Sequence, residues 1–440
     1  MLISQARIVN EGRIVEADVL VQKGRIERIA PFIAAPPRTR VVDARGKLLL
    51  PGVIDDQVHF REPGFPHKGD IASESAAAVA GGTTSFMEMP NTDPKTVTRE
   101  LLKAKYQLAE KRAHANYAFY FGATNDNLAE IERLAPGEAC GVKIFMGAST
   151  GNMLVDDPAT LESIFAKCPT LIATHCESTP RIKAAEAAAR AKYGEDVPAA
   201  EHAHIRDAQC CYESSSLAVG LARKHGANLH VLHLTTAREL ALFQPGDRRI
   251  TAEACVHHLF LDESAYATLG HRAKCNPSIK TAADRQALVQ GVKDGRITLI
   301  ATDHAPHTAD EKAQSYFKAP SGLPVIQHSL LMMLELVQRG ELDLKTVVHR
   351  MCHAPAERFG VQQRGYVREG WHADLVLVDP KTPTKVTAES LLYRCGWSPF
   401  EGQSFSHSIA ATWVNGEIAW ESGKLAARPH GKRLEFGTQP

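Results

Sequence analysis

The chain has 440 residues, of which 44% are hydrophobic and 23% are charged, with 51 basic and 50 acidic side chains. This length exceeds one ordinary domain but suits one large α/β barrel with an appendage, and the composition is typical of a globular protein with a large core. A formal net charge of +1 favours neither a nucleic-acid partner nor an anionic membrane, and we expect neither.

The first fifty residues have the pattern of short strands. The opening stretch MLISQARIVNEGRIVEADVLV carries charges throughout and has no apolar core of signal-peptide length, and no window of the chain predicts a membrane span. Turn-forming Gly, Asn and Asp residues separate the runs LISQARIV, EADVLVQ, GRIERIA and RVVDARG. We therefore predict that residues 1–50 form the first part of a small β-domain.

From Leu48 onward, apolar strand-like runs alternate with helical patterns. The helix candidates include TRELLKAKYQLAEKRAH and ADRQALVQGVKDG. Eight strands of the buried type with intervening helices predict a parallel (β/α)₈ barrel over residues 51–360. The eight runs are LLLPGVID, GGTTSFMEMP, NYAFYFGAT, CGVKIFM, TLIATHCE, NLHVLHLTT, RITAEACVHH and TLIATDHAPH.

After about residue 360 the pattern of short strands returns. ADLVLVDP and ATWVNGEIAWESGK are the clearest segments, and the second contains an Asn-Gly hairpin turn at Asn415 and Gly416. Because the two ends of the chain look alike, we predict that residues 361–440 complete the β-domain that residues 1–50 begin.

The nine cysteines are scattered and odd in number, and the chain has no Cys-x-x-Cys pair. The neighbouring Cys210 and Cys211 fit helix packing better than redox chemistry. This usage favours free thiols and a cytoplasmic location.

Nearly every apolar run of the predicted barrel ends in a polar side chain of a type that active sites use. In a (β/α)₈ barrel the carboxyl ends of all strands meet at one mouth, where active sites lie. A single histidine at a strand end is more often structural than a ligand. Three of them, together with an aspartate and a lysine, favour a functional site. The strand-end residues are His59, Asn91, Lys143, His175, His233 and Asp303.

Lys143 lies between Val142 and Ile144 in an apolar run, where burial disfavours the charged form of its amine. One interpretation is a lysine that extends to the barrel mouth or pairs with Asp303. The other is a neutral amine that reacts with CO₂ to give a carbamate, an anionic ligand that can bridge two cations. Asp303 is correspondingly either a structural carboxylate or a metal ligand that accepts a proton from a metal-bound water.

Motifs along essentially the whole chain resemble those of the dihydroorotases, in the cyclic-amidase branch of the amidohydrolase superfamily. Found together and in order, they are very specific for the superfamily. The motifs are DQVHFREPG, GGTTSFMEMPNTDP, GVKIFMGAS, THCES, HVLHLTT, TAEACVHHL, KCNPSIK, ATDHAPH, APSGLP, GWHADLVLVD and SPFEG.

The resemblance implies a binuclear zinc centre at the barrel mouth. Of the two histidines in HVLHLTT, the motif favours His233 as the ligand, and His230 is then a strand residue. The residues that match the ligands are His59 and Asp303 for the first metal, His175 and His233 for the second, and Lys143, as a carbamate, for both.

The resemblance also implies reversible hydrolysis of (S)-dihydroorotate to N-carbamoyl-L-aspartate in pyrimidine (UMP) biosynthesis, with a metal-activated hydroxide as nucleophile and Asp303 as general acid and base. Arg61 matches the residue that binds the substrate carboxylate, for which a guanidinium fork is well suited. The alternative for Arg61 is a surface ion pair with Glu62 or Asp56. The other residues that match substrate contacts are His59, Asn91, Asn276, His307, Ser321 and Gly322.

Two positions depart from the family pattern. Gln57 stands where the family has the first histidine of a His-x-His pair, and Lys280 in NPSIK stands where an arginine is more usual. On a strand, Gln57 and His59 point the same way, but a neutral amide is a poor zinc ligand. We therefore expect one or two zinc ions per chain, with the first position weakened.

Two other functions compete with this one. A cyclic amidase of the hydantoinase or allantoinase type would share the metal centre, although Arg61 and Asn91 fit a carboxylate on the ring better. A non-catalytic homologue that scaffolds aspartate carbamoyltransferase is favoured by Gln57. The expected partners are a small-molecule substrate and a second copy of the chain in a homo-oligomer such as a dimer, with aspartate carbamoyltransferase as a further candidate.

Overall fold

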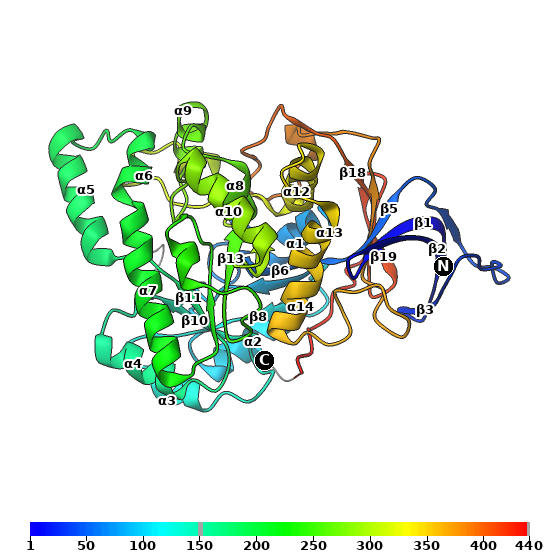
Figure 1. Cartoon of the computed structure of the whole chain (residues 1–440), viewed down its shortest axis with the longest axis horizontal. Helices are drawn as coiled ribbons and strands as arrows, with labels where there is room; N and C mark the ends of the chain where they lie inside the picture. Colours follow the sequence, from blue (N-terminus) through cyan, green and yellow to red (C-terminus); the bar gives the residue numbers. More distant parts are fainter. Residues whose placement is uncertain (148–152, 438–440) are drawn as a thin grey trace.

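The computed structural model of the chain describes residues 1–147 and 153–437. Two regions lie side by side: a barrel of strands surrounded by helices, and a β-sheet at the other end of the molecule (Figure 1). The predicted fold class, a (β/α)₈ barrel with a small β-domain, is confirmed. The last two residues of the GVKIFMGAS motif lie outside the described residues.

The barrel strands follow one another around the ring in chain order. Parallel pairing joins β6, β7 and β8, and then β9 through β14, while β8 and β9 are consecutive pieces of one strand. A parallel bridge between Val58 and His304 links the first strand to the segment after the last one, which closes the ring. The strands are β6 (Val53–Val58), β7 (Thr83–Glu88), β8 (Asn116–Phe119), β9 (Phe121–Gly122), β10 (Val142–Phe145), β11 (Ile172–His175), β12 (Leu229–Val231), β13 (Ile250–Cys255) and β14 (Leu299–Ala301).

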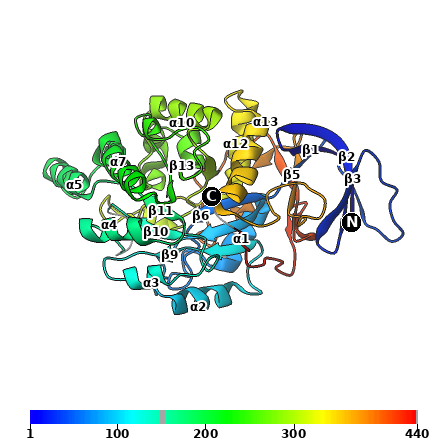
Figure 2. The same cartoon turned by 60° about the horizontal axis from the view of Figure 1, so that its bottom comes forward.

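Helices cover the outside of the barrel, as the turned view shows (Figure 2). Their ends follow local signals: Asp207 and Thr281 cap the first turns of α7 and α10, and Gly226 and Gly295 end these helices in the left-handed conformation. The helices are α1 (Ile71–Ala80), α2 (Arg99–Ala109), α3 (Leu128–Glu132), α4 (Pro158–Lys167), α5 (Thr179–Tyr193), α6 (His202–Ile205), α7 (Ala208–His225), α8 (Val256–Phe260), α9 (Ala265–Leu269), α10 (Ala282–Asp294), α11 (Ala309–Lys312), α12 (Ser329–Gln338), α13 (Leu344–Val348) and α14 (Ala354–Phe359).

Strands from both ends of the chain share the second sheet, where β15 pairs antiparallel with β5. The predicted hairpin turn at Asn415 and Gly416 joins β18 to β19, and both residues have positive φ angles. Domain boundaries near residues 50 and 360 stay a prediction. The strands are β1 (Leu2–Asn10), β2 (Arg13–Gln22), β3 (Arg25–Ala30), β4 (Val41–Asp43), β5 (Leu48–Pro51), β15 (Leu375–Asp379), β18 (Ser408–Val414), β19 (Glu417–Glu421) and β20 (Lys424–Leu425), and a separate pair is β16 (Thr384–Lys385) with β17 (Ser404–Phe405).

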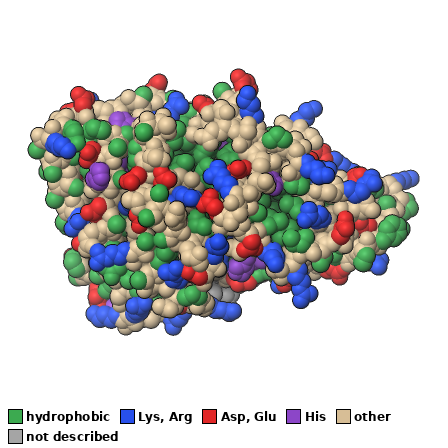
Figure 3. All heavy atoms as spheres, turned by 45° about the horizontal axis from the view of Figure 1, so that its top comes forward, with side chains coloured by type: hydrophobic (Ala, Val, Ile, Leu, Met, Phe, Trp, Pro, Cys, Tyr) green, Lys and Arg blue, Asp and Glu red, His purple; other side chains and the backbone are tan. Residues whose placement is uncertain are grey.

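The surface is mixed in charge. Acidic and basic side chains are interspersed over the face that Figure 3 shows, as the near-zero net charge leads one to expect. Among the described helices, none has both the length and the apolar character that a membrane crossing requires. All nine cysteines are free thiols, and Cys210 and Cys211 are buried on α7.

Candidate active site

The predicted site residues other than His307 line a cavity of about 30 Å³ at the carboxyl ends of the barrel strands. The strands are parallel, so their carboxyl ends open on one mouth. A larger hollow of about 840 Å³, between α2 and residues 429–433, contains none of these residues. The cavity is lined by Gln57, His59, Arg61, Asn91, Lys143, Phe145, His175, His233, Asn276, Asp303, Ala305, Ser321 and Gly322.

The backbone is strained at three of the lining residues. Arg61, His233 and Asp303 have φ angles of 71°, 38° and 46°, a region that side chains other than glycine seldom adopt. Such conformations persist where the surrounding structure holds them, and they are concentrated at active sites. Each of the three lies two or three residues beyond the end of a barrel strand, at the mouth.

His175 and His233 face each other with the spacing of two ligands on one ion. His175 Nδ1 lies 3.0 Å from His233 Nε2, and two nitrogens bound to one tetrahedral zinc are roughly 3.3 Å apart. Burial lowers the pKa of both imidazoles, and neutral imidazole is the form that binds metal. His175 Nε2 lies 3.0 Å from a carboxylate oxygen of Glu177, which itself pairs with Arg206. This outer pair fixes the ring so that Nδ1 points at the cavity.

His59 and Asp303 form the other half of the mouth. His59 Nδ1 lies 2.8 Å from Asn91 Oδ1, to which it donates, and this leaves the lone pair of Nε2 directed at Asp303 Oδ1, 3.1 Å away. A lone pair and a carboxylate oxygen repel unless a cation lies between them. Without a cation, the alternative is a protonated His59 whose Nε2 donates to Asp303. Burial would raise the pKa of Asp303, but that hydrogen bond and the charges of His59, His257 and Lys143 then hold this pKa below its usual value. The pair therefore fits a metal site.

Gln57 presents a hydrogen-bond donor to this position. Its Nε2 donates to Asp303 Oδ1 at 3.1 Å, while the thiol of Cys255 contacts its Oε1 at 3.7 Å. The amide nitrogen has no lone pair for a cation, and the amide oxygen points toward Cys255. The chemistry of the donor set thus fits a full second position and a first position that lacks one ligand.

Lys143 is 1% exposed, and burial lowers the pKa of its amine to about 8. No carboxylate of the described chain lies within ion-pair distance of its Nζ, which lies 4.6 Å from the ring centre of Phe145. The interpretation of Lys143 as the ion-pair partner of Asp303 is therefore wrong for this structure. An unpaired amine, part of which is neutral near pH 8, is the form that reacts with CO₂.

Arg61 is buried, and its guanidinium donates from Nε to the carbonyl of Pro306 at 3.0 Å. Its Nη2 lies 2.9 Å from His307 Nε2. The surface pairing considered from the sequence is wrong, because Asp56 is fully buried inside the barrel and Glu62 pairs with Arg112 at 2.8 Å.

His307 lies behind Arg61 and is not among the residues that line the cavity. Its Nε2 contacts Arg61 and the carbonyl of Ser321 at 3.1 Å, and its Nδ1 lies 3.2 Å from Lys68 Nζ. A neutral imidazole has one acceptor nitrogen, so it satisfies one of these two cations. Lys68 also pairs with Glu311 at 2.8 Å, whereas Arg61 has no carboxylate partner among the described residues. A direct substrate contact for His307 stays a prediction.

The remaining predicted residues shape the wall of the cavity. Gly322 has a φ of 145°, and a Cβ there would lie 2.4 Å from the carbonyl oxygen of Ala305, so only glycine fits. Asn276 Oδ1 is buried without a hydrogen-bond partner in the described structure and is available to a ligand N–H. Lys280 donates to the hydroxyl of Ser278 at 2.7 Å and does not line the cavity.

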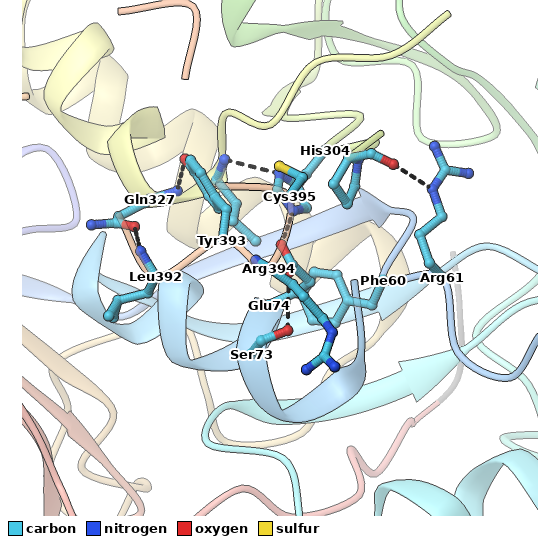
Figure 4. Close-up of polar contacts among 12 residues, drawn as sticks. Phe60, Arg61, Ser73, Glu74, His304, Gln327, Leu392, Tyr393, Arg394 and Cys395 are labelled. Carbon is cyan, nitrogen blue, oxygen red and sulfur yellow. Dashed lines mark hydrogen bonds and ion pairs between the residues drawn. The ribbon is translucent and has the colours of Figure 1, made fainter. Parts of the chain in front are cut away.

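Sequence reasoning missed a buried pair formed by His304, the residue that follows Asp303. Glu74 on α1 lies 2.7 Å from His304 Nε2, and both side chains are fully buried (Figure 4). The other oxygen of Glu74 accepts from the backbone N–H of Arg394, and Trp397 Nε1 donates to the carbonyl of His307 at 2.7 Å. The C-terminal SPFEG region thereby holds the segment after β14. The ATDHAPH motif marks His304, but nothing local marks Glu74.

Comparisons with known proteins agree with this geometry. A model described as the amidohydrolase family matches residues 48–419. A dihydroorotase of Halobacterium salinarum is 33% identical over 424 residues, which cover 93% of this chain and 97% of the relative. An allantoinase of Bacillus velezensis is 31% identical over 432 residues, which cover 96% of this chain and 94% of the relative.

Solved structures extend the likeness to the whole fold. The L-hydantoinase (dihydropyrimidinase) of Arthrobacter aurescens has a TM-score of 0.92 with 28% identity, and the match covers 99% of both chains. The relatives therefore act on several cyclic amides, and the choice among substrates rests on the residues of the cavity.

Proposed function

Because this chain belongs to the amidohydrolase family and its relatives are cyclic amidases, we propose that it is a dihydroorotase. The proposed reaction is the reversible hydrolysis of (S)-dihydroorotate to N-carbamoyl-L-aspartate in pyrimidine biosynthesis. The single observation that carries the choice of substrate is Arg61, a buried cation that lines the cavity and has no carboxylate partner.

Arg61 has only neutral partners in the described structure, the carbonyl of Pro306 and the ring of His307. Burial lowers its pKa to about 10, so the guanidinium is still charged at neutral pH. A buried cation without a counter-ion costs several kcal/mol, and a bound carboxylate would offset that cost. Dihydroorotate carries a carboxylate on its ring, whereas hydantoin, dihydrouracil and allantoin do not.

The chain's residues fit one or two divalent ions at the mouth, for which we propose zinc. His175, His233 and a carbamate on Lys143 would hold one ion, and His59 and Asp303 the other. When bound, such an ion lowers the pKa of a water to near neutrality and polarises the amide carbonyl.

The protein side chains supply orientation and proton transfer. Asp303, whose carboxyl is ionised at neutral pH, accepts the proton of the attacking water at its carboxylate and returns it to the leaving ring nitrogen. Arg61 binds the ring carboxylate through its fork, and Asn91 and Asn276 orient the ring through their amides. Burial of the cavity under Ser321 and Gly322 limits the access of bulk water.

Two alternatives remain as outcomes of a test. The L-hydantoinase and allantoinase likenesses favour another cyclic amide as substrate. Gln57 favours a non-catalytic homologue that binds aspartate carbamoyltransferase. We propose a cytoplasmic enzyme, in keeping with its nine free cysteines, and a homo-oligomer as its assembly.

We expect purified protein to hydrolyse dihydroorotate in preference to hydantoin, dihydrouracil and allantoin, because only the first brings an anion to Arg61. A panel of the four rings, assayed by ring opening with the same enzyme batch, measures this. Faster turnover of a ring without a carboxylate would contradict dihydroorotate as the substrate. No turnover of any ring by metal-loaded protein would favour the non-catalytic homologue.

We expect Gln57→His to raise the number of zinc ions at the mouth by up to one per chain. The new imidazole would share a strand face with His59 and replace an N–H donor by a nitrogen lone pair. Metal analysis after dialysis without chelator measures the difference from unaltered protein. Gln57→Asn is the matched control, because it keeps an amide and adds no lone pair. Equal zinc in Gln57→His and unaltered protein would show that position 57 does not limit occupancy.

A further inference from the structure

Three buried side chains meet inside the barrel, apart from the cavity. Asp56 lies on β6, His230 on β12 and Glu253 on β13, and each is 0% exposed. None of the three lines the cavity at the mouth. Asp56 lies three residues before His59, and His230 lies three residues before His233, so the cluster sits deeper in the strands than the ligands. We call this set the inner cluster.

The distances within the inner cluster are those of ligands around one ion. His230 Nε2 lies 3.1 Å from Glu253 Oε2 and 3.6 Å from Asp56 Oδ2, and ligand atoms of all three lie within 4.8 Å of one another. Donor atoms about 2.0–2.2 Å from a zinc ion are separated by roughly 2.8–3.6 Å, depending on the geometry. The side chains therefore surround a point that a cation can occupy.

The hydrogen bonds around His230 direct a lone pair at this point. The hydroxyl of Thr251 donates to the carbonyl of Leu229 and accepts from Arg358 Nε at 2.6 Å. Its oxygen is then the acceptor for His230 Nδ1, 2.8 Å away. With its proton on Nδ1, His230 presents the lone pair of Nε2 to two carboxylates. This outer hydrogen bond is the kind that orients a metal-binding imidazole.

The negative charge of the inner cluster is only partly compensated, since Glu253 Oε1 accepts from the backbone N–H of His233 at 3.2 Å. Neither carboxylate oxygen of Asp56 has a hydrogen-bond partner in the described structure. The charges of Arg358 and Lys143 act on Asp56, yet among the described residues neither cation forms an ion pair within 4 Å of Asp56 or Glu253. A carbamate on Lys143 would add a further negative charge. A buried carboxylate that receives no hydrogen bond, like that of Asp56 in the described structure, is strongly unfavourable, and a cation beside it would offset that cost.

We propose that Asp56, His230 and Glu253 bind one divalent cation of the zinc or manganese class inside the barrel. One imidazole with two carboxylates is a donor set that both ions accept. The cation joins three strands, β6, β12 and β13, and its role is structural. The site does not depend on which cyclic amide the enzyme hydrolyses.

The test is the metal content of Lys143→Ala protein, which lacks the bridging ligand of the mouth. We expect one ion per chain to remain in this variant and to be lost when Glu253→Gln or Asp56→Asn is added. The matched control is Glu239→Gln in the same background, because Glu239 is a buried glutamate that bonds to Ser215 and Thr236 instead. It should keep the ion. No ion in Lys143→Ala, or an ion that survives Glu253→Gln, would overturn the proposal.

Two further measurements separate this proposal from the proposed function and from misfolding. Glu253→Gln alone should lose one ion while the mouth keeps its own, whether or not Lys143 is a carbamate. Anomalous diffraction at the metal edge, on crystals of the unaltered protein, should show a peak between Asp56, His230 and Glu253. No peak there would mean that a proton shared by the two carboxylates stabilises the cluster, and the cation site would be wrong.

Discussion

Lys143→Ala is expected to remove the metal from the barrel mouth and to reduce activity by roughly a thousandfold or more, since a metal ion supplies several kcal/mol of transition-state stabilisation. The expectation follows from the position of Lys143, a buried amine at the cavity with no carboxylate partner in the described structure. Its carbamate would be the ligand common to both ions. Metal content and activity should therefore fall together, and both are measured on the same dialysed sample.

Two comparisons separate loss of the carbamate from loss of a positive charge. Lys143→Arg keeps a cation but cannot react to give the carbamate, so its metal content at the barrel mouth should be as low as that of Lys143→Ala. Formate or acetate added to Lys143→Ala places a carboxylate in the vacated space and should restore part of the metal and part of the activity. Full mouth metal in Lys143→Ala would contradict the carbamate. Full metal content at the mouth of Lys143→Arg would show that metal binding there needs only the positive charge of residue 143 and not a carbamate.

The fold was predictable because its signals are local. Seven of the eight apolar runs matched barrel strands, since buried parallel strands need continuous apolar sequence, while the first run, LLLPGVID, divides between β5 of the second sheet and the start of β6. The hairpin at Asn415 and Gly416 followed from the demand of its turn for positive φ angles. The shared location of the predicted site residues was predictable for a related reason, because parallel strands bring their carboxyl ends to one mouth; the role of each residue stays a prediction.

Other features depend on contacts between distant segments. Sequence placed Gln57 beside His59, but only the structure shows that its amide nitrogen faces Asp303 and its oxygen faces Cys255. The contact of Glu74 with His304 joins residues 230 positions apart. No spacing along the chain encodes such a pair, because it forms only when the barrel closes.

The surface ion pair considered for Arg61 was wrong for the same reason, because it depended on contacts between distant segments. On the sequence, Asp56 is a charged residue near the start of a polar stretch, and charged residues are usually exposed. The closed barrel instead buries Asp56 against His230 and Glu253, on the inner side of the strand. Among the described residues, Arg61 is thereby left without a carboxylate partner, and this makes it the residue that best tests the substrate.

Arg61→Met is expected to reduce kcat/KM for dihydroorotate by the equivalent of about 2–5 kcal/mol, which is the usual cost of breaking a buried charge pair. This corresponds to a fall of roughly 30-fold to several thousandfold. Methionine keeps much of the apolar stem and removes the fork that would bind the ring carboxylate. Metal content should not change, because Arg61 is not among the expected ligands. Steady-state kinetics and metal analysis of the variant measure both quantities.

The substrate itself supplies the control for this variant. If Arg61 acts on the carboxylate, Arg61→Met should lose little or nothing on dihydrouracil, which has the same ring without that group, while it loses activity on dihydroorotate. Arg61→Lys keeps the charge but not the fork, so its kcat/KM for dihydroorotate should lie between the values of the unaltered protein and Arg61→Met. Equal losses on both rings would mean that Arg61 supports the site through Pro306 and His307. Kinetics like those of unaltered protein on dihydroorotate would remove the reason for choosing this substrate over hydantoin or allantoin.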